Sequence, residues 1–227
     1  NWKVIRWVDI YLGIPLAYLV FCLKGIVGAR FDADTAGCRK ILLVKFWGLG
    51  NVVMLLPAAK ALKESYPGAT IDLLTLSSNK DISSVTDIFQ DIYTINTDNP
   101  AIFICTALRH LIGLKNNKYD LVIDFEQFAR FSSVFCAFIG EKERIGFNTP
   151  HQHRHFLYTR TVVYDDSVHV VSAFCGLAQL AGADNRGNAA VAPILCREAD
   201  LGRMNRLLRE LGVEKHDFLV LLHAGTS

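Results

Sequence analysis

The sequence lacks the features that mark several common classes of protein. Its formal net charge is only +2 over 227 residues, so no overall basic charge indicates a nucleic-acid partner. No cysteines form a C-x-x-C pair and four lie in apolar runs, which predicts reduced, buried thiols rather than disulfides or a zinc site. The cysteines are Cys22, Cys38, Cys105, Cys136, Cys175 and Cys196. Neither an internal repeat nor a low-complexity stretch is present.

Apolar residues, by contrast, are plentiful. They make up 51% of the chain, which excludes a disordered or collagen-like protein. The length corresponds to about 1.5 domains of ordinary size. The chain starts at Asn1 rather than Met and ends at Ser227, just after a predicted strand and turn. We therefore expect a fragment of a longer protein.

The first 36 residues form a separate apolar segment. Residues 10–23 contain no charge, yet these 14 residues are fewer than the roughly 20 that a membrane-spanning helix needs. Aromatic and basic side chains flank the run: Trp2, Trp7, Tyr11, Tyr18, Lys3, Arg6, Lys24 and Arg30. We predict that residues 1–36 are an amphipathic segment lying on an anionic membrane surface. A short span and a helix packed on its own domain are the alternatives, whereas a cleavable signal peptide lacks its cleavage site.

From Lys40 onward, short apolar runs alternate with stretches of helical spacing. The predicted strands are 40–46, 70–76, 92–95, 120–125 and 144–147, with an extended segment at 157–164. The predicted helices are 52–66, 81–89, 101–114, 128–139, 168–180 and 198–211. The alternation predicts an α/β, doubly wound parallel-sheet domain of Rossmann-like type over residues 40–212. Residues 218–227 are predicted to be the start of a second domain, with a strand at 218–222 and a turn after it, truncated at that point.

Two motifs lie at the predicted carboxyl edge of the sheet, where open α/β folds bind ligands. The first strand is followed by Gly48, Gly50 and Asn51. A glycine-containing turn here either lets an anion approach the N-terminus of the next helix or is a tight turn that binds no ligand. The third glycine of a dinucleotide fingerprint and a Walker A motif are absent. Asp124 and Glu126 end a later strand, and either they face a ligand on one side or one of them caps the following helix.

Histidines mark two further segments. The run His151, His153 and His155 has strand spacing and allows a metal site, but a solvated loop is the preferred interpretation. An anion-binding loop that includes Lys142, Arg144 and Arg160 is the second choice. His169 opens a helix and is interpreted as a packed helix-start residue or a domain-interface residue. No Ser-His-Asp or Cys-His constellation follows from the sequence.

Four stretches in order resemble one family, the bacterial ADP-heptose:lipopolysaccharide heptosyltransferases (glycosyltransferase family 9). They read ILLVKFWGLGNVVMLLPAAKALKESYPGATIDLLT, YDLVIDFEQFARFSSVFCAFIGEKERIGF, HVVSAFCGLAQLAGA and FLVLLHAGTS, and together they lie within residues 40–227. The resemblance implies a GT-B fold, with an acceptor-binding N-terminal domain and a nucleotide-sugar-binding C-terminal domain. It also implies transfer with inversion, a general base on the acceptor hydroxyl, and neither metal nor cofactor.

The same resemblance assigns roles to individual positions. Asn51 stands where the family has its aspartate base and cannot take a proton, so Asp124 and Glu126 become candidate bases. The expected acceptor-binding residues are Lys45, Gly48, Gly50, Arg130, Lys142 and Arg144. Lys45 has an alternative as a strand-end lysine that reaches solvent. The expected donor-side or interdomain residues are His169, His223, Gly225 and Thr226, with Ala224 in place of the family's usual proline.

These expectations define one function and two rivals. The first is transfer of a sugar, heptose from ADP-heptose as substrate, to a lipid-linked lipopolysaccharide-core acceptor at the cytoplasmic side of the bacterial inner membrane. The second is a catalytically altered or inactive, membrane-associated glycan-binding homologue, which the loss of the aspartate favours. A Rossmann oxidoreductase is disfavoured, because Ser77, Ser78 and Asn79 stand where an acidic residue should end the second strand.

Overall fold

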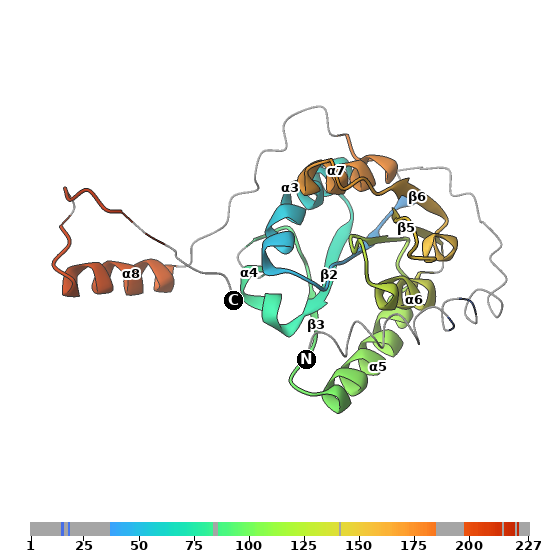
Figure 1. Ribbon diagram of the computed structural model, residues 1–227, viewed down its shortest axis with the longest axis horizontal. Coiled ribbons are helices and arrows are strands. Elements are labelled where there is room, and N and C mark those ends of the chain that lie inside the picture. Colours follow the sequence, from blue (N-terminus) through green and yellow to red (C-terminus); the bar gives the residue numbers. More distant parts are fainter. Residues whose placement is uncertain are drawn as a thin grey trace. The chain divides into compact units, whose positions relative to one another are not determined.

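The computed structural model describes residues 37–83, 86–140, 142–184, 198–214 and 216–220, together with Pro15, Tyr18 and Leu222. The chain divides into two units, Asn1–Pro193 and Ile194–Ser227, which are considered separately. The first unit contains a sheet with helices on both sides (Figure 1).

The sheet has six strands in the order β3-β2-β1-β4-β5-β6, and every pair of neighbours is parallel. The strands are β1 (Lys40–Val44), β2 (Thr70–Leu76), β3 (Ile92–Ile95), β4 (Leu121–Asp124), β5 (Glu143–Asn148) and β6 (Arg160–Val163). The helices are α3 (Leu49–Ser65), α4 (Lys80–Ser83), α5 (Pro100–Asn116), α6 (Arg130–Ile139), α7 (Val170–Leu180) and α8 (Glu198–Glu210), and the 3₁₀ turns are η2 (Ser77–Asn79) and η3 (His155–Leu157). This confirms the predicted doubly wound α/β fold, because the order reverses between β1 and β4.

Helices cover both faces of the sheet because successive side chains of a strand point to opposite faces. On one face of the sheet, Ile41 of β1 belongs to a buried apolar cluster that includes Leu55 of α3 and residues of α7. Leu42, the next residue, belongs to a second cluster with Ala107 of α5 and Phe135 of α6. A strand buried on both sides needs the unbroken apolar run that predicted it.

Local signals set the ends of the helices. At α5, Asn99 Oδ1 accepts a hydrogen bond from Ile102 N at 2.9 Å, and Pro100 takes the first helical position, where no N–H is needed. Helix α3 begins at Leu49, before the predicted residue 52, and Pro57 lies inside it. The predicted helix 81–89 is wrong beyond Ser83, since residues 86–91 have no regular structure.

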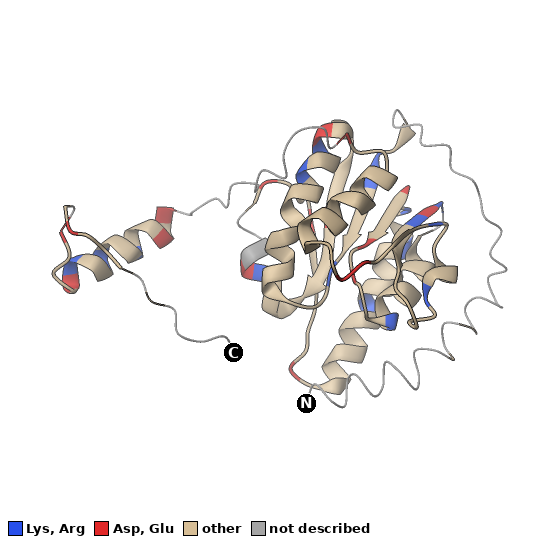
Figure 2. Cartoon of the chain, turned by 45° about the horizontal axis from the view of Figure 1, so that its top comes forward, with Lys and Arg blue, Asp and Glu red and all other residues tan. Residues whose placement is uncertain are grey.

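Helix α8 of the C-terminal unit forms as predicted. None of its side chains is buried, and it groups with the second unit. The domain bounds 40–212 stay a prediction. Figure 2 shows charges of both signs along α8. Residues 218–220 form no strand, and Phe218 is 93% exposed; the described residues of the second unit include no strand with which they could pair.

The predicted amphipathic segment falls outside the described residues, apart from Pro15 and Tyr18. Both are helical, and the ring of Tyr18 lies 4.8 Å from that of Phe156, centroid to centroid. Within the described part of the chain, no helix is long and apolar enough to cross a membrane.

Candidate functional site at the carboxyl edge of the sheet

The turn from β1 to α3 is exposed at the carboxyl edge of the sheet. Gly48 has φ +86°, a left-handed conformation that glycine adopts without strain, and it is exposed together with Leu49 and Gly50. No side chain caps the N-terminus of α3, which leaves its first N–H groups directed outward. Asn51 Nδ2 donates to Trp47 O at 3.4 Å across the turn. The site therefore presents backbone donors and one amide at the surface.

A buried ion pair holds this turn from below. Lys45 Nζ lies 3.1 Å from Glu126 Oε1 and also donates to Gln127 Oε1 at 3.0 Å. The same Glu126 oxygen accepts the backbone N–H groups of Phe46 and Trp47, each at 2.7 Å. Glu126 therefore ties the end of β1 to the segment that follows β4.

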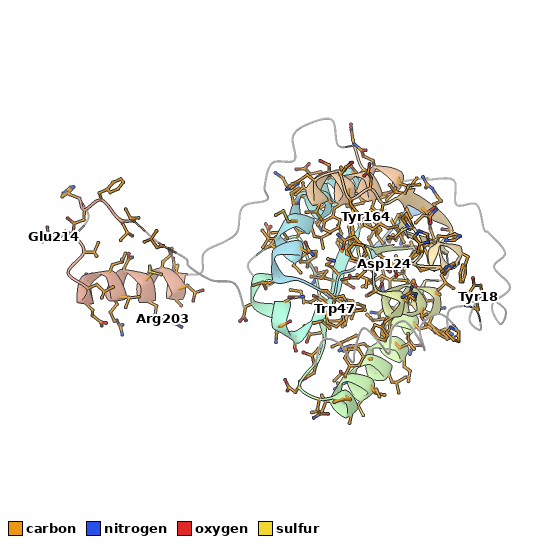
Figure 3. All side chains as sticks on the ribbon, viewed as in Figure 1. Tyr18, Trp47, Asp124, Tyr164, Arg203 and Glu214 are labelled. Atoms are coloured by element: carbon orange, nitrogen blue, oxygen red, sulfur yellow. The ribbon has the colours of Figure 1, made fainter. Side chains whose placement is uncertain are left out.

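A second buried ion pair lies beside the first. Asp124, at the end of β4, accepts from Arg154 Nη2 at 3.1 Å and from Tyr158 Oη at 2.6 Å through Oδ2. Its other oxygen accepts from Glu126 N at 2.9 Å. Arg154 also donates to Ala129 O and Glu126 O. Figure 3 labels Asp124 among the densely packed side chains of the first unit.

Burial and charge act in opposite directions on these groups. Burial lowers the pKa of Lys45, and the adjacent Glu126 offsets that effect only in part. Burial also tends to lower the pKa of Arg154. The nearby Tyr158, Asp124 and Glu126 outweigh the effect of burial, so that the pKa of Arg154 is raised. Burial raises the pKa of Tyr158, which stays protonated and remains a donor. The two cations and two carboxylates balance one another, which is what a buried charged cluster requires.

The two candidate bases thus have protein partners in this structure. Asp124 is fully buried and Glu126 nearly so. Neither caps the following helix, because the N-cap residue of α6 is Ala129, whose side chain has no group that could cap it, so that alternative is wrong. Asp124 is the last residue of β4 and Glu126 lies two residues beyond it, so strand alternation does not decide which side Glu126 faces. The role of either residue as a base stays a prediction.

The predicted acceptor-binding cations lie at different ends of the sheet. Lys45 is buried, so the alternative in which it reaches solvent is wrong. Arg130 starts α6 at the carboxyl edge and donates to Gln152 O at 2.9 Å. Lys142 pairs with Asp120, which precedes β4 at the opposite edge. Arg144 donates to the carbonyls of Gly140 and Leu157 near the start of β5, so it too lies away from the Gly48 turn.

The histidine segment contains the residue that sequence reasoning missed. His151 and His153 are exposed with φ of 62° and 50°, and His155 is exposed in η3, as a solvated loop requires. Among the described residues, no group of three or more histidine, cysteine or acidic side chains is placed to hold a metal ion. Arg154, between two exposed histidines, is completely buried. Nothing local marks it, because its partner Asp124 lies 30 residues away.

His169 lies at the start of a helix, as one of its two interpretations predicted, but it is not packed as that interpretation required. It is the N-cap residue of α7, and its Nδ1 accepts from Val171 N at 3.3 Å. The side chain is exposed. The other three donor-side predictions, His223, Gly225 and Thr226, lie outside the described residues.

Comparison with known proteins places this arrangement in one fold class. The sheet order and its helices match the α/β fold of GT-B glycosyltransferase structures. A glycosyltransferase of family 9 from Veillonella parvula matches with a TM-score of 0.68 and 15% identity, covering 79% of this chain and 52% of that one. E. coli heptosyltransferase WaaC, solved with ADP-2-deoxy-2-fluoro heptose, matches with a TM-score of 0.57 and 18% identity over 67% of this chain and 52% of that one.

E. coli ADP-heptose lipopolysaccharide heptosyltransferase II gives a similar result, with a TM-score of 0.57 and 16% identity over 78% of this chain and 51% of that one. The chain therefore spans about half the length of the solved chains it matches. The sequence matches no family model, and no curated protein is similar to it. The predicted resemblance is thus confirmed in the fold.

Proposed function

We propose that the protein containing this chain is an inverting glycosyltransferase and that residues 40–184 form its acceptor-binding half. The observation that carries the proposal is the parallel sheet of order β3-β2-β1-β4-β5-β6, which matches solved glycosyltransferases with TM-scores up to 0.68. The exposed Gly48 turn lies at the edge where such sheets bind their ligands. The donor half would follow residue 218, and the described chain alone would then be inactive.

The donor we propose is ADP-heptose, and the acceptor a lipid-linked lipopolysaccharide core at the cytoplasmic face of a bacterial inner membrane. The structural neighbours from E. coli, whose names include heptosyltransferase, support this choice. An acceptor phosphate or hydroxyl would meet the uncapped N–H groups of α3, and the helix dipole favours a negative charge there. Arg130 would add a cation at the same edge.

Transfer needs a group that removes the proton from the attacking hydroxyl. Asn51 lies at the turn, but its amide can form hydrogen bonds without taking up a proton. We therefore assign it to orient the acceptor. Asp124 and Glu126 would serve as base only after exchanging a cation or backbone partner for substrate. The buried Lys45–Glu126 pair acts in either case as a positioning device for the Phe46–Gly48 segment.

The test is release of ADP from ADP-heptose by the full-length protein, with and without a deacylated core acceptor. Acceptor-dependent release supports the proposal. Asn51→Asp places a carboxylate at the turn, and a rise in kcat of about a hundredfold or more would match the contribution of a general base. Asn205→Asp, an exposed change on α8, is the matched control and should leave the rate unchanged.

A second function is favoured by the amide at Asn51 together with the burial of both carboxylates. In this alternative the protein binds glycan or lipid-linked sugar without transferring it. No donor consumption by either the wild type or Asn51→Asp, combined with binding of the core acceptor, would reject the enzyme and support this function.

A further inference from the structure

Helix α5 carries an apolar stripe on its outer side. Ile104 is 56% exposed, Leu108 52% and Ile112 66%. These residues are four apart, so they lie above one another on successive turns of the helix. Ala101 and Cys105 are exposed on the same side. The described part of the chain leaves this stripe uncovered.

The opposite side of α5 already attaches the helix to its domain. Ala107 and Leu114 are buried in the cluster beneath the sheet, and the ring of Phe103 lies 5.3 Å from that of Phe131 in α6. The outer stripe is therefore not needed to hold α5 in place. An exposed apolar stripe of this kind on an otherwise attached helix indicates a binding surface.

The charged residues of α5 itself and of the turn that follows it are all basic. Between Asn99 and Tyr119 the sequence has no acidic residue but has Arg109, Lys115 and Lys118. All three side chains are exposed. Figure 2, in which acidic residues are red, accordingly shows none on this helix. A stripe of Ile and Leu with basic residues beside it complements a surface that is apolar inside and anionic outside.

We infer that α5 docks through this stripe on an anionic lipid surface. The apolar side chains enter the boundary between headgroups and acyl chains while the basic side chains meet lipid phosphates. A second copy of the chain would bring the same basic residues together. The charge pattern therefore favours lipid over a second copy, and the test below distinguishes lipid from a segment of the chain itself.

The direction of α5 links this surface to the candidate site. The helix follows β3, so its first turn, with Ala101 and Ile104, starts from the carboxyl edge of the parallel sheet. Docking would hold that edge close to the membrane, where a lipid-linked acceptor lies. This link rests on the proposed function, whereas docking itself rests on α5 alone.

The test reads the environment of α5 directly. Cys105 is exposed, and the other described cysteines, Cys38, Cys136 and Cys175, are buried. In the full-length protein carrying Cys22→Ser and Cys196→Ser, an environment-sensitive fluorophore on Cys105 should shift to the blue and be quenched by brominated lipid. Vesicles of phosphatidylethanolamine with phosphatidylglycerol should produce this change, and phosphatidylcholine vesicles should not.

Matched variants separate docking from general effects. The double variant Leu108→Glu with Ile112→Glu should lower the partition coefficient on anionic vesicles by about tenfold or more, because two apolar side chains no longer enter the lipid. Val163→Glu changes an equally exposed apolar residue on β6 and should leave partitioning unchanged. Unchanged thermal melting of both variants shows that the fold is intact.

Three results would overturn the inference. A Cys105 label already shielded without vesicles would show that the chain covers its own stripe. Shielding that rises with protein concentration would indicate a second copy. A label that stays accessible while the protein is on vesicles would place the membrane contact elsewhere. Because no readout involves sugar transfer, these results are independent of whether the enzyme proposal holds.

Discussion

At the scale of single residues, Glu126 joins the ends of the two central strands. Its Oε1 accepts from Lys45 Nζ and from two backbone N–H groups of the β1–α3 segment. A carboxylate with three donors in a buried place is stable only while its cation is present. Charge at this edge thus supports the shape of the turn as well as any chemistry there.

Removing the buried cation Lys45 should therefore lower the stability of the fold much more than removing a cation at the surface. Lys45→Met leaves Glu126 charged and buried, and we expect the free energy of unfolding to fall by about 3–5 kcal/mol. Lys60→Met removes the exposed partner of Glu64, whose Oε1 lies 3.8 Å from Lys60 Nζ. This variant should change the free energy of unfolding by about 0.5 kcal/mol or less. Urea unfolding followed by circular dichroism measures both, and similar losses for the two variants would contradict the buried pair.

Two buried aspartates at the opposite edge titrate in opposite senses. Burial tends to raise the pKa of Asp120, but hydrogen bonds from Lys142 and backbone N–H groups outweigh it and hold that pKa below its usual value. Burial raises the pKa of Asp72, and the hydrogen bond from Tyr119 Oη compensates only in part. The stabilising contribution of Asp120 is therefore complete above about pH 4 and lost as pH falls through its lowered pKa. That of Asp72 is present below about pH 4 and lost as pH rises through its raised pKa.

Replacing each aspartate with asparagine should show these opposite pH dependences of stability. Relative to the wild type, Asp120→Asn should be increasingly destabilising as the pH rises from about 3 to 5, because the ionised carboxylate becomes the better partner. The stability deficit of Asp72→Asn should shrink as the pH rises above about 4. Unfolding free energies measured across this range by chemical denaturation provide the check, and parallel slopes for the two variants would refute the assignment.

At the scale of the elements, the β1–α3 turn depends on one of its two glycines. A Cβ on Gly48 would lie 2.9 Å from Asn51 Nδ2, and its φ is positive, whereas a Cβ on Gly50 meets nothing within 4 Å. Gly48→Ala should lower the free energy of unfolding by about 1–2 kcal/mol. Gly50→Ala should leave it unchanged or raise it by up to about 1 kcal/mol, since alanine is the better helix former. Thermal melting of the pair tests this, and equal effects would argue against the turn geometry.

The elements could be predicted because each carries its signal locally. Buried strands such as β1 and β4 read as continuous apolar runs, and Asn99-Pro100 marks the start of α5. The predicted helix 81–89 fails in its second half, since residues 86–89 have no helical structure although their periodicity predicts one. The run 218–222 has a strand-like composition, yet a strand exists only with a neighbour to bond.

The site could be predicted only in part, because its contacts are long-range. Parallel-sheet logic brings Asp124 and Glu126 to the edge of the Gly48 turn correctly. It does not identify their cations, since Lys45 and Arg154 lie 81 and 30 residues away from the carboxylates they pair with. Lys142 resembles an acceptor-binding residue in the sequence, but it precedes its strand rather than following it and therefore lies at the other edge.

At the scale of the whole molecule, the first unit contains every described buried apolar residue. A chain ending at Pro193 should therefore melt within about 3 °C of the whole chain, because α8 buries nothing. A chain ending at Ser167 also loses α7, with Phe174 and Leu177 of the core, and should not fold cooperatively. Thermal circular dichroism distinguishes these outcomes, and a large loss from the Pro193 truncation would show that α8 contributes to the first unit.

The strand order also determines how this chain emerges from the ribosome. The strands β1, β2 and β3 lie on one side of the sheet and are synthesised first. The contact of Lys40 with Asp120 can form only after a further 80 residues have been synthesised. Closing so long a loop is slow, and until then the apolar edge of β1 has no neighbour. Such an edge is a template for pairing with other chains. The nascent protein is thus most prone to aggregation after β3 has been synthesised and before β4 has docked.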